Sequence, residues 1–173
     1  MRVAIDASVL AYLFDASAAA PAGPDGSLVS HCQARVEHLL SELQQARATL
    51  IIPAPALSEI LVYAGEAAPS WLGTLAGNRC CRIAPFDTLA AVECAALARD
   101  RLVHGRAADV SRRKAKFDEQ IAAIALVERA DEILSDDAHI RQLVGQRMTV
   151  RGIADLPLPP KSDQMPLIFE EPD

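Results

Sequence analysis

Four acidic residues stand where the sequence otherwise predicts buried structure. Asp6 directly follows a short β-prone run, and the pair Asp136-Asp137 directly follows another. Glu59 and Asp118 lie within apolar helical stretches, Asp118 in register with the alanines of an apolar face. Crowded carboxylates repel one another, and a divalent cation relieves that repulsion. The expected metal ligands and catalytic residues are Asp6, Glu59, Asp118 and Asp137, whose hard oxygen donors suit Mg²⁺ or Mn²⁺.

A metal site of this composition predicts the hydrolysis of phosphodiester bonds. Mg²⁺ keeps several of its waters and completes its coordination shell with phosphate oxygens of the substrate. Such a site lowers the pKa of a bound water, orients that water for in-line attack and stabilises the leaving oxygen. We therefore expect hydrolysis without a covalent intermediate.

Each of these acids also has a purely structural explanation. Asp6 or Asp137 could cap the helix that follows it, because Asp is a favoured N-cap residue. Asp118 could interact with the dipole of a helix N-terminus, and Glu59 could be an exposed helix residue. The neighbouring Glu119 is expected to lie off the packed face of its helix. The joint pattern, with two acids at strand ends and two in apolar helices, favours the metal site.

The elements that must position these acids alternate along the chain. Expected strands span residues 2–5, 49–52, 81–84, 132–135 and 148–150, the last at an edge of the sheet. Expected helices span residues 9–14, 31–46, 55–65, 71–75, 88–103 and 117–129, with a short helix around Ile140. This alternation predicts βαβ units, hence an α/β fold with a parallel sheet and helices on both faces. Ligands bind such sheets beyond the carboxyl ends of the strands, where Asp6 and Asp137 would lie.

Length, charge and cysteine spacing limit the classes of protein to which this chain can belong. The length of 173 residues suits one domain, which we expect at 1–156, followed by a proline-rich acidic tail at 157–173. The net charge of −6 argues against a general basic surface that coats nucleic acid. No long uncharged apolar stretch is present, so we expect a cytoplasmic protein without a membrane span. The four cysteines lack the spacing of a zinc site and are expected to be free thiols.

A basic segment precedes Asp118 and could bind the phosphates of a nucleic acid. Seven of the 17 Lys and Arg residues fall between Arg99 and Lys116. The alternative is an ordinary solvated surface. Tyr63 and Trp71 could stack on bases, although we expect them in the core or at an interface. The candidate residues for binding nucleic-acid phosphates are Arg112, Arg113, Lys114 and Lys116.

Four segments around the acids together resemble motifs of the PIN-domain family, especially its VapC-like toxin ribonucleases. They are residues 3–10, 53–61, 117–125 and 133–140, in the order of that family. The resemblance implies a PIN-like three-layer α/β/α fold with a central parallel sheet of four to five strands. It also implies an Mg²⁺- or Mn²⁺-dependent endoribonuclease with Asp137 in the fourth acidic position. Supporting roles around the ligands then fall to Ser8, Ser135 and Asp136.

The resemblance extends to partners, with departures at the fourth motif. It implies an RNA substrate, an antitoxin protein and a homodimer. His139 and Ile140 stand where the family usually has an acidic and an aromatic residue, and we expect His139 to be a solvated helix residue. The tail has no counterpart in the family.

Two other classes of protein compete with the ribonuclease. One is a catalytically weak PIN-like module that binds RNA or protein. The other is a phosphatase or receiver domain with acids at strand ends. A haloacid dehalogenase-like phosphatase would need an Asp where Ser8 stands, and a receiver would need an acidic pair after the first strand. The sequence therefore disfavours the second class.

Overall fold

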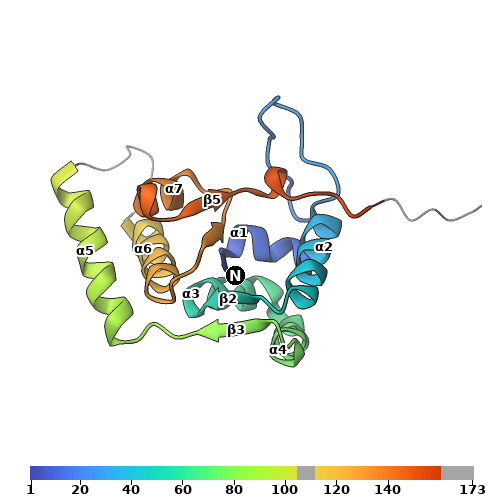
Figure 1. The fold of residues 1–173 in the computed structure, drawn as a ribbon, viewed down its shortest axis with the longest axis horizontal. Helices are drawn as coiled ribbons and strands as arrows, with labels where there is room; N and C mark the ends of the chain where they lie inside the picture. The colour runs from blue at the N-terminus through green and yellow to red at the C-terminus, as the bar shows by residue number, and fades with distance from the viewer. Residues whose placement is uncertain (105–111, 161–173) are drawn as a thin grey trace, which may run out of the picture.

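Five parallel strands form the centre of the molecule (Figure 1). The computed structural model describes the backbone of residues 1–104 and 112–160, and the side chains of 1–100 and 114–160. The sheet order is β3-β2-β1-β4-β5, and every neighbouring pair is parallel. The predicted parallel sheet is thus confirmed, with its last strand at an edge. The strands are β1 (Arg2–Ile5), β2 (Thr49–Pro53), β3 (Cys81–Ala84), β4 (Glu132–Leu134) and β5 (Thr149–Arg151).

Helices cover both faces of this sheet and make a three-layer α/β/α architecture. In Figure 1, α2 lies on one side of the strands, and α5 and α6 lie on the other. The α-helices are α1 (Ala7–Leu10), α2 (Cys32–Gln45), α3 (Ala54–Ala64), α4 (Ala68–Gly77), α5 (Thr88–His104), α6 (Arg112–Val127) and α7 (Ala138–Val144). Short 3-10 turns are η1 (Ala11–Leu13), η2 (Gly65–Ala67), η3 (Gly145–Arg147) and η4 (Ile153–Asp155).

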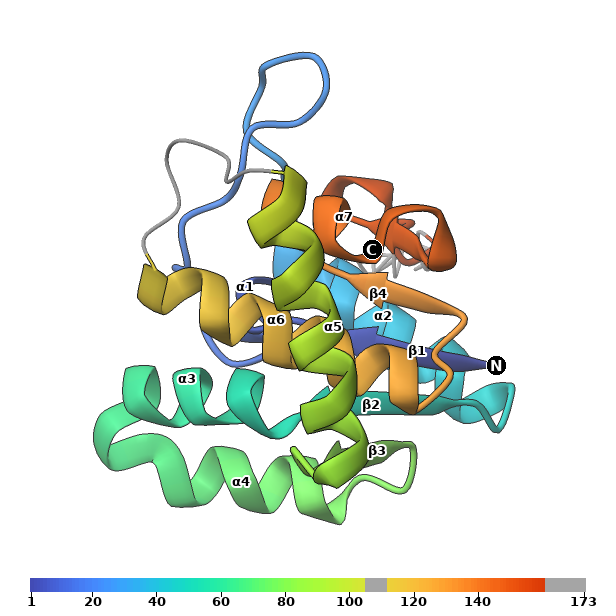
Figure 2. The same ribbon diagram turned by 90° about the vertical axis from the view of Figure 1, so that its left-hand side faces the viewer.

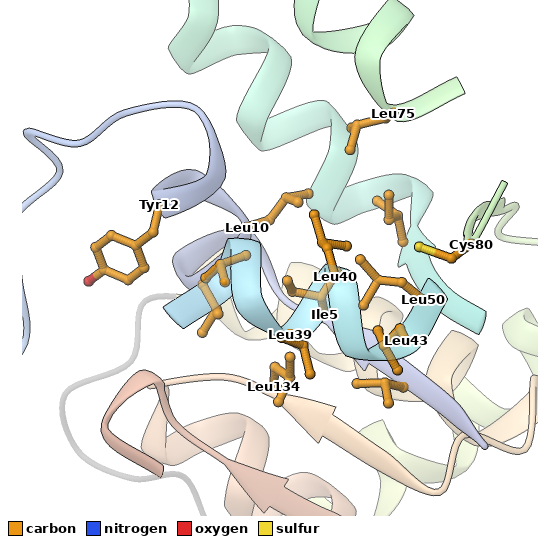
Figure 3. Packing of buried hydrophobic residues seen from close by; sticks show 14 of the residues in the cluster. Ile5, Leu10, Tyr12, Leu39, Leu40, Leu43, Leu50, Leu75, Cys80 and Leu134 are labelled. Carbon is orange, nitrogen blue, oxygen red and sulfur yellow. The ribbon is translucent and has the colours of Figure 1, made fainter. Parts of the chain in front are cut away.

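The face under α2 is filled by branched aliphatic side chains. Ile5 and Leu50 of the sheet meet Leu39 and Leu43 of α2 (Figure 3). Successive strand residues point to opposite faces, so Ile5 belongs to this cluster while Ala4 belongs to the cluster under α6. Truncating a buried leucine such as Leu43 to Ala would cost about 2–5 kcal/mol of folding free energy.

The opposite face depends on small residues. Ala122, Ala123 and Ala125 of α6 are completely buried, together with Ile121. Their short side chains let α6 lie close to the sheet, and α5 then crosses over α6 (Figure 2). Because α6 lies between the sheet and α5, its position determines where its acidic residues lie.

Helix α6 begins earlier than its apolar periodicity predicts. It starts at Arg112 and not at residue 117. The added residues are Arg, Lys and Ala, which have high helix propensity although they lack an apolar pattern. Asp118 therefore lies well inside α6, and the proposed interaction with a helix N-terminus does not explain it.

Three further predictions concern the chain as a whole. All four cysteines are free thiols, as expected. Within the described part of the chain, no helix combines the length and the apolar character needed to cross a membrane. The tail predicted from residue 157 lies mostly outside the described residues, which end at 160.

Candidate active site

Asp6 occupies the end of β1 and is held by three hydrogen bonds. Its Oδ1 accepts the N–H of Ala7 at 2.7 Å, which caps α1. Its Oδ2 accepts the hydroxyl of Ser8 at 2.8 Å and that of Ser135 at 2.9 Å. The Asp6 side chain is buried. The capping role considered from the sequence is therefore real, and it fixes the carboxylate at the carboxyl edge of the sheet.

Ser135 joins the end of β4 to the end of β1. Its buried hydroxyl donates to Asp6 and accepts the N–H of Asp137 at 3.0 Å. Asp137 in turn caps α7 by accepting the N–H of His139 at 2.7 Å. Ser8 and Ser135 thus both donate hydrogen bonds to Asp6, the carboxylate beside which the resemblance places them.

Asp118 reaches the same region from α6 and contacts a histidine. Its Oδ2 lies 2.8 Å from Nδ1 of His139, and both side chains are buried. The expectation of a solvated His139 was wrong, because α7 starts directly after the Asp137 cap and packs against α6. Burial raises the pKa of Asp118, and the charges of Asp137 and Asp6 add to that rise, although the His139 hydrogen bond opposes it.

Glu59 enters from α3, which is less buried than its sequence indicates. Ile60 is buried, but Val62 is 81% exposed, and Glu59 itself is exposed on its outer side. Its pKa is nevertheless raised, first by partial burial and then by the charges of Asp6 and Asp118. Glu59 therefore belongs electrostatically to the same acidic group.

The four carboxylates line one pocket of about 320 Å³. They come from four separate elements: the end of β1, α3, α6 and the junction of β4 with α7. A larger hollow of about 830 Å³ lies between the ends of α2 and α4, but no acidic residue lines it. The smaller pocket is therefore the candidate active site, because of its acidic lining and despite its smaller volume. Its lining includes Asp6, Ser8, Glu59, Tyr63, Lys114, Asp118 and Asp137.

A lysine already occupies part of this acidic pocket. Nζ of Lys114 lies 2.5 Å from Oδ2 of Asp137. Burial of Asp137 would raise its pKa, but the Lys114 ammonium and the His139 N–H outweigh burial and lower that pKa. The carboxylate of Asp137 in turn raises the pKa of Lys114.

The donor set fits Mg²⁺ or Mn²⁺ by chemistry and location. Four carboxylates supply the hard oxygen ligands that both ions prefer. Across the described residues, no three His, Cys, Asp or Glu side chains already stand together as a ready-made metal site. At Asp137 an ion would compete with the Lys114 ammonium. The pocket therefore holds carboxylates of the kind that bind these ions, but they do not stand as an assembled metal site.

Asp136 points elsewhere. Its Oδ1 accepts the N–H of Ile153 at 2.9 Å, and it does not line the acidic pocket. This bond braces the start of η4 after β5. Among the described contacts Asp136 makes no hydrogen bond to the other acids, although the charge of Asp6 adds to the rise of its pKa that burial causes.

The predicted basic patch is only partly described. The backbone of Arg112 and Arg113 lies in α6, but their side chains lie outside the described residues. Lys116 is exposed and does not line the pocket. Lys114 is the basic residue that the structure places at the acids.

Glu119 is a buried residue that the sequence analysis placed on the solvent side. Its exposed fraction is only 2%, so that prediction was wrong. The crossing of α5 over α6 covers this face, and the Glu119 charge raises the pKa of Cys94 on α5 in addition to the larger effect of burial. Helical periodicity within α6 could not reveal a second helix packed on its outer side.

Two aromatic residues near the pocket have different surroundings. Trp71 stacks on Phe14 with ring centroids 4.6 Å apart, which agrees with the packing role expected for it. Tyr63 lines the pocket, is 59% exposed, and donates its hydroxyl hydrogen bond to Asp15. The Tyr63 ring therefore forms an exposed, anchored wall of the acidic pocket.

Comparisons with known proteins find similar structures but no similar sequence. No family model and no curated protein matches the sequence. A chain of the VapBC2 complex from Rickettsia felis, solved with a DNA fragment from its promoter, superposes with a TM-score of 0.63 at 15% identity. That match covers 88% of this chain and 98% of the other. The chain has a PIN-like fold.

Two more solved structures agree with this fold. A chain of FitAB bound to the IR36 DNA fragment gives a TM-score of 0.59 at 16% identity, covering 90% of this chain and 97% of that one. A chain of DNA-bound VapBC from Salmonella typhimurium gives 0.58 at 12% identity, covering 88% and 98%. The resemblance to VapC-like PIN domains is thus confirmed as a likeness of fold.

Proposed function

We propose that the protein is a metal-dependent endoribonuclease that hydrolyses RNA phosphodiester bonds. One observation carries this proposal: carboxylates from four elements far apart in the sequence line a single pocket. Their mutual repulsion contributes to the raised pKa of Glu59 and of Asp118. A bound Mg²⁺ or Mn²⁺ would offset that repulsion.

Each residue then has a role that follows from its contacts. Asp6, Asp118 and Asp137 would hold the ion, which supplies Lewis acidity toward the phosphate and its attacking water. Ser135 and His139 orient the first two of these carboxylates. Glu59 has a raised pKa and no hydrogen bond among those described, so it is the acid suited to accept the proton of the attacking water.

The pocket walls suit a single-stranded polynucleotide. The exposed ring of Tyr63 offers a stacking surface for a base beside the acids. The basic residues of α6, among them Lys116, would contact the phosphates on either side of the cleaved bond. The net charge of −6 would limit nonspecific binding elsewhere.

Cleavage of a mixed RNA pool with Mn²⁺, with Mg²⁺ or with EDTA tests this function. We expect cleavage with either metal and none with EDTA. Asp6→Asn and Asp118→Asn should each reduce the rate by about 10²-fold or more, because each removes a charged ligand. Asp25→Asn makes the same chemical change in an exposed loop and should cleave as the wild type does. Cleavage that survives both EDTA and Asp118→Asn would exclude the proposal.

A physiological role as the toxin of a toxin–antitoxin pair follows from the resemblance to VapC-like proteins. Expression of the wild type should arrest bacterial growth, while Asp118→Asn should not. A small protein encoded beside this chain should relieve the arrest as its antitoxin, by placing an Arg or Lys at the acids. Equal growth arrest by the wild type and by Asp118→Asn would argue against a toxic nuclease.

One observation favours a second candidate, a catalytically weak PIN-like module that binds RNA or protein. Lys114 neutralises Asp137, and the described acids are not fully assembled around an ion position. Binding of RNA without cleavage at millimolar Mn²⁺ would support this module. Metal-dependent cleavage would exclude it.

A further inference from the structure

Lys114 is built into the acidic pocket and does not merely flank it. It lies four residues before Asp118 on α6, so both side chains project from one face of the helix toward the pocket. Its ammonium contacts Asp137 at 2.5 Å, while the side chain as a whole stays 56% exposed. The ammonium is therefore paired inside the pocket, although solvent reaches much of the side chain.

Lys114 lies where a counter-ion of the pocket carboxylates would lie. The ammonium contacts Asp137 and lines the same pocket as Asp6, Glu59 and Asp118, so it places positive charge among the carboxylates as a divalent cation there would. It contacts the oxygen of Asp137 that the cap of α7 leaves available, because Oδ1 accepts the N–H of His139. An ion that binds this Oδ2 competes with the ammonium through charge repulsion at close range.

We propose that Lys114 is an exchangeable counter-ion of the acidic site. It pairs with Asp137 while the site lacks a metal, and it turns to the phosphate of the substrate when a metal takes Asp137. This inference rests on the proposed function. Lysine suits the role because its ammonium is a compact charge on a flexible four-carbon chain, whereas Arg binds carboxylates through two parallel bonds and would leave less readily.

Calorimetric titration of the full chain with Mn²⁺, without RNA, tests the exchange. Lys114→Met should bind Mn²⁺ roughly three- to tenfold more tightly than the wild type, because the competing ammonium is gone. Lys116→Met removes a charge from the same helix outside the pocket and should change the affinity by less than about twofold. Lys114→Arg should bind no more tightly than the wild type.

The same variant should cleave RNA more slowly. At saturating Mn²⁺, Lys114→Met should lose about ten- to 100-fold in kcat/KM, because the phosphate contact is lost. Tighter metal binding combined with slower cleavage is the signature of exchange. A merely structural lysine would weaken both together, and that result would overturn the proposal.

Lysine labelling of the wild type gives a readout that needs no variant. Acylation of Lys114 should become several-fold faster when Mn²⁺ is added, because its pairing with Asp137 ends, while Lys116 should not change. Unchanged labelling of Lys114 at saturating Mn²⁺, or Lys114→Met that binds Mn²⁺ no more tightly than Lys116→Met, would refute the exchange alone. If the wild type does not bind Mn²⁺ at all, both the proposed function and this inference fail.

Discussion

At the scale of single residues, hydrogen bonds hold the carboxylates of this site in place, whereas their negative charges push them apart. Ser8 and Ser135 hold Asp6 in place, and His139 holds Asp118. The carboxylates so held repel one another, which costs folding free energy as long as no cation is bound. Two predictions follow from this opposition, one about charge and one about orientation.

Replacing Glu59 with Gln should stabilise the metal-free protein at neutral pH. The pKa of Glu59 is raised in the folded state, so its ionised form costs stability above that pKa and costs nothing below the pKa of the unfolded chain. The gain should be small, about 1–3 °C in Tm, because Glu59 is exposed and solvent screens its charge. It should shrink as the pH falls through the raised pKa of Glu59. Thermal unfolding between pH 7.5 and 4 measures this.

A matched control uses an acid outside the pocket. Glu66 is exposed in η2 and does not line the acidic pocket. Glu66→Gln should leave Tm unchanged at every pH. A Glu59→Gln gain that is equal at pH 7.5 and at pH 4 would contradict the electrostatic explanation.

Replacing Ser135 with Ala should weaken both the fold and the site. The half-buried N–H of Asp137 would lose its acceptor and the buried Asp6 would lose a donor, which costs about 1–3 kcal/mol of folding free energy. Mn²⁺ affinity should fall about 10- to 100-fold, because Asp6 loses part of its orientation. Ser135→Thr keeps the hydroxyl and should recover much of the affinity. If Ser135→Ala leaves Mn²⁺ affinity intact, Ser135 is not an orienting residue.

At the scale of secondary-structure elements, the strand ends were predictable from sequence and the helix faces were less so. Asp6 and Asp137 follow β-prone runs directly, so their place at one edge of the sheet follows from parallel topology. His139 and Glu119 were misjudged because their burial depends on how α7 and α5 pack against α6. The Lys114–Asp137 contact depends in addition on α6 starting five residues before the predicted one, at 112 in place of 117.

The junction of β5 and η4 gives a prediction at this scale. A Cβ at Gly152 would lie 2.5 Å from Oδ1 of Asp136, the atom that accepts the N–H of Ile153. Gly152→Ala should therefore destabilise the protein by about 1 kcal/mol or more through loss of that bond. Gly73→Ala in α4 meets no atom within 4 Å and should stabilise by about 0.5–1 kcal/mol. Urea unfolding should give a lower free energy of unfolding for Gly152→Ala and a higher one for Gly73→Ala. Equal changes in the two variants would contradict the packing described at Gly152.

At the scale of the whole molecule, the surface retains apolar side chains that suit the homodimer implied by the family resemblance. Leu89 and Val92 project from one face of α5 and are each 65% exposed. We expect a dimer through this face. The double variant Leu89→Glu, Val92→Glu should be monomeric in sedimentation velocity runs at tens of micromolar. Leu28→Glu alters a leucine in a loop that is still more exposed, at 72%, and should remain dimeric. A monomeric wild type would rule this interface out.

The central claim is that four carboxylates converge on one pocket and that three of them hold an ion there. A crystal grown with Mn²⁺, with anomalous data collected at the manganese absorption edge, tests it without reference to activity. We predict an anomalous peak in the pocket within about 2.0–2.4 Å of carboxylate oxygens of Asp118, Asp137 and Asp6, with Lys114 turned away from Asp137. A map without a peak in this pocket at millimolar Mn²⁺, with Lys114 still on Asp137, would contradict the account.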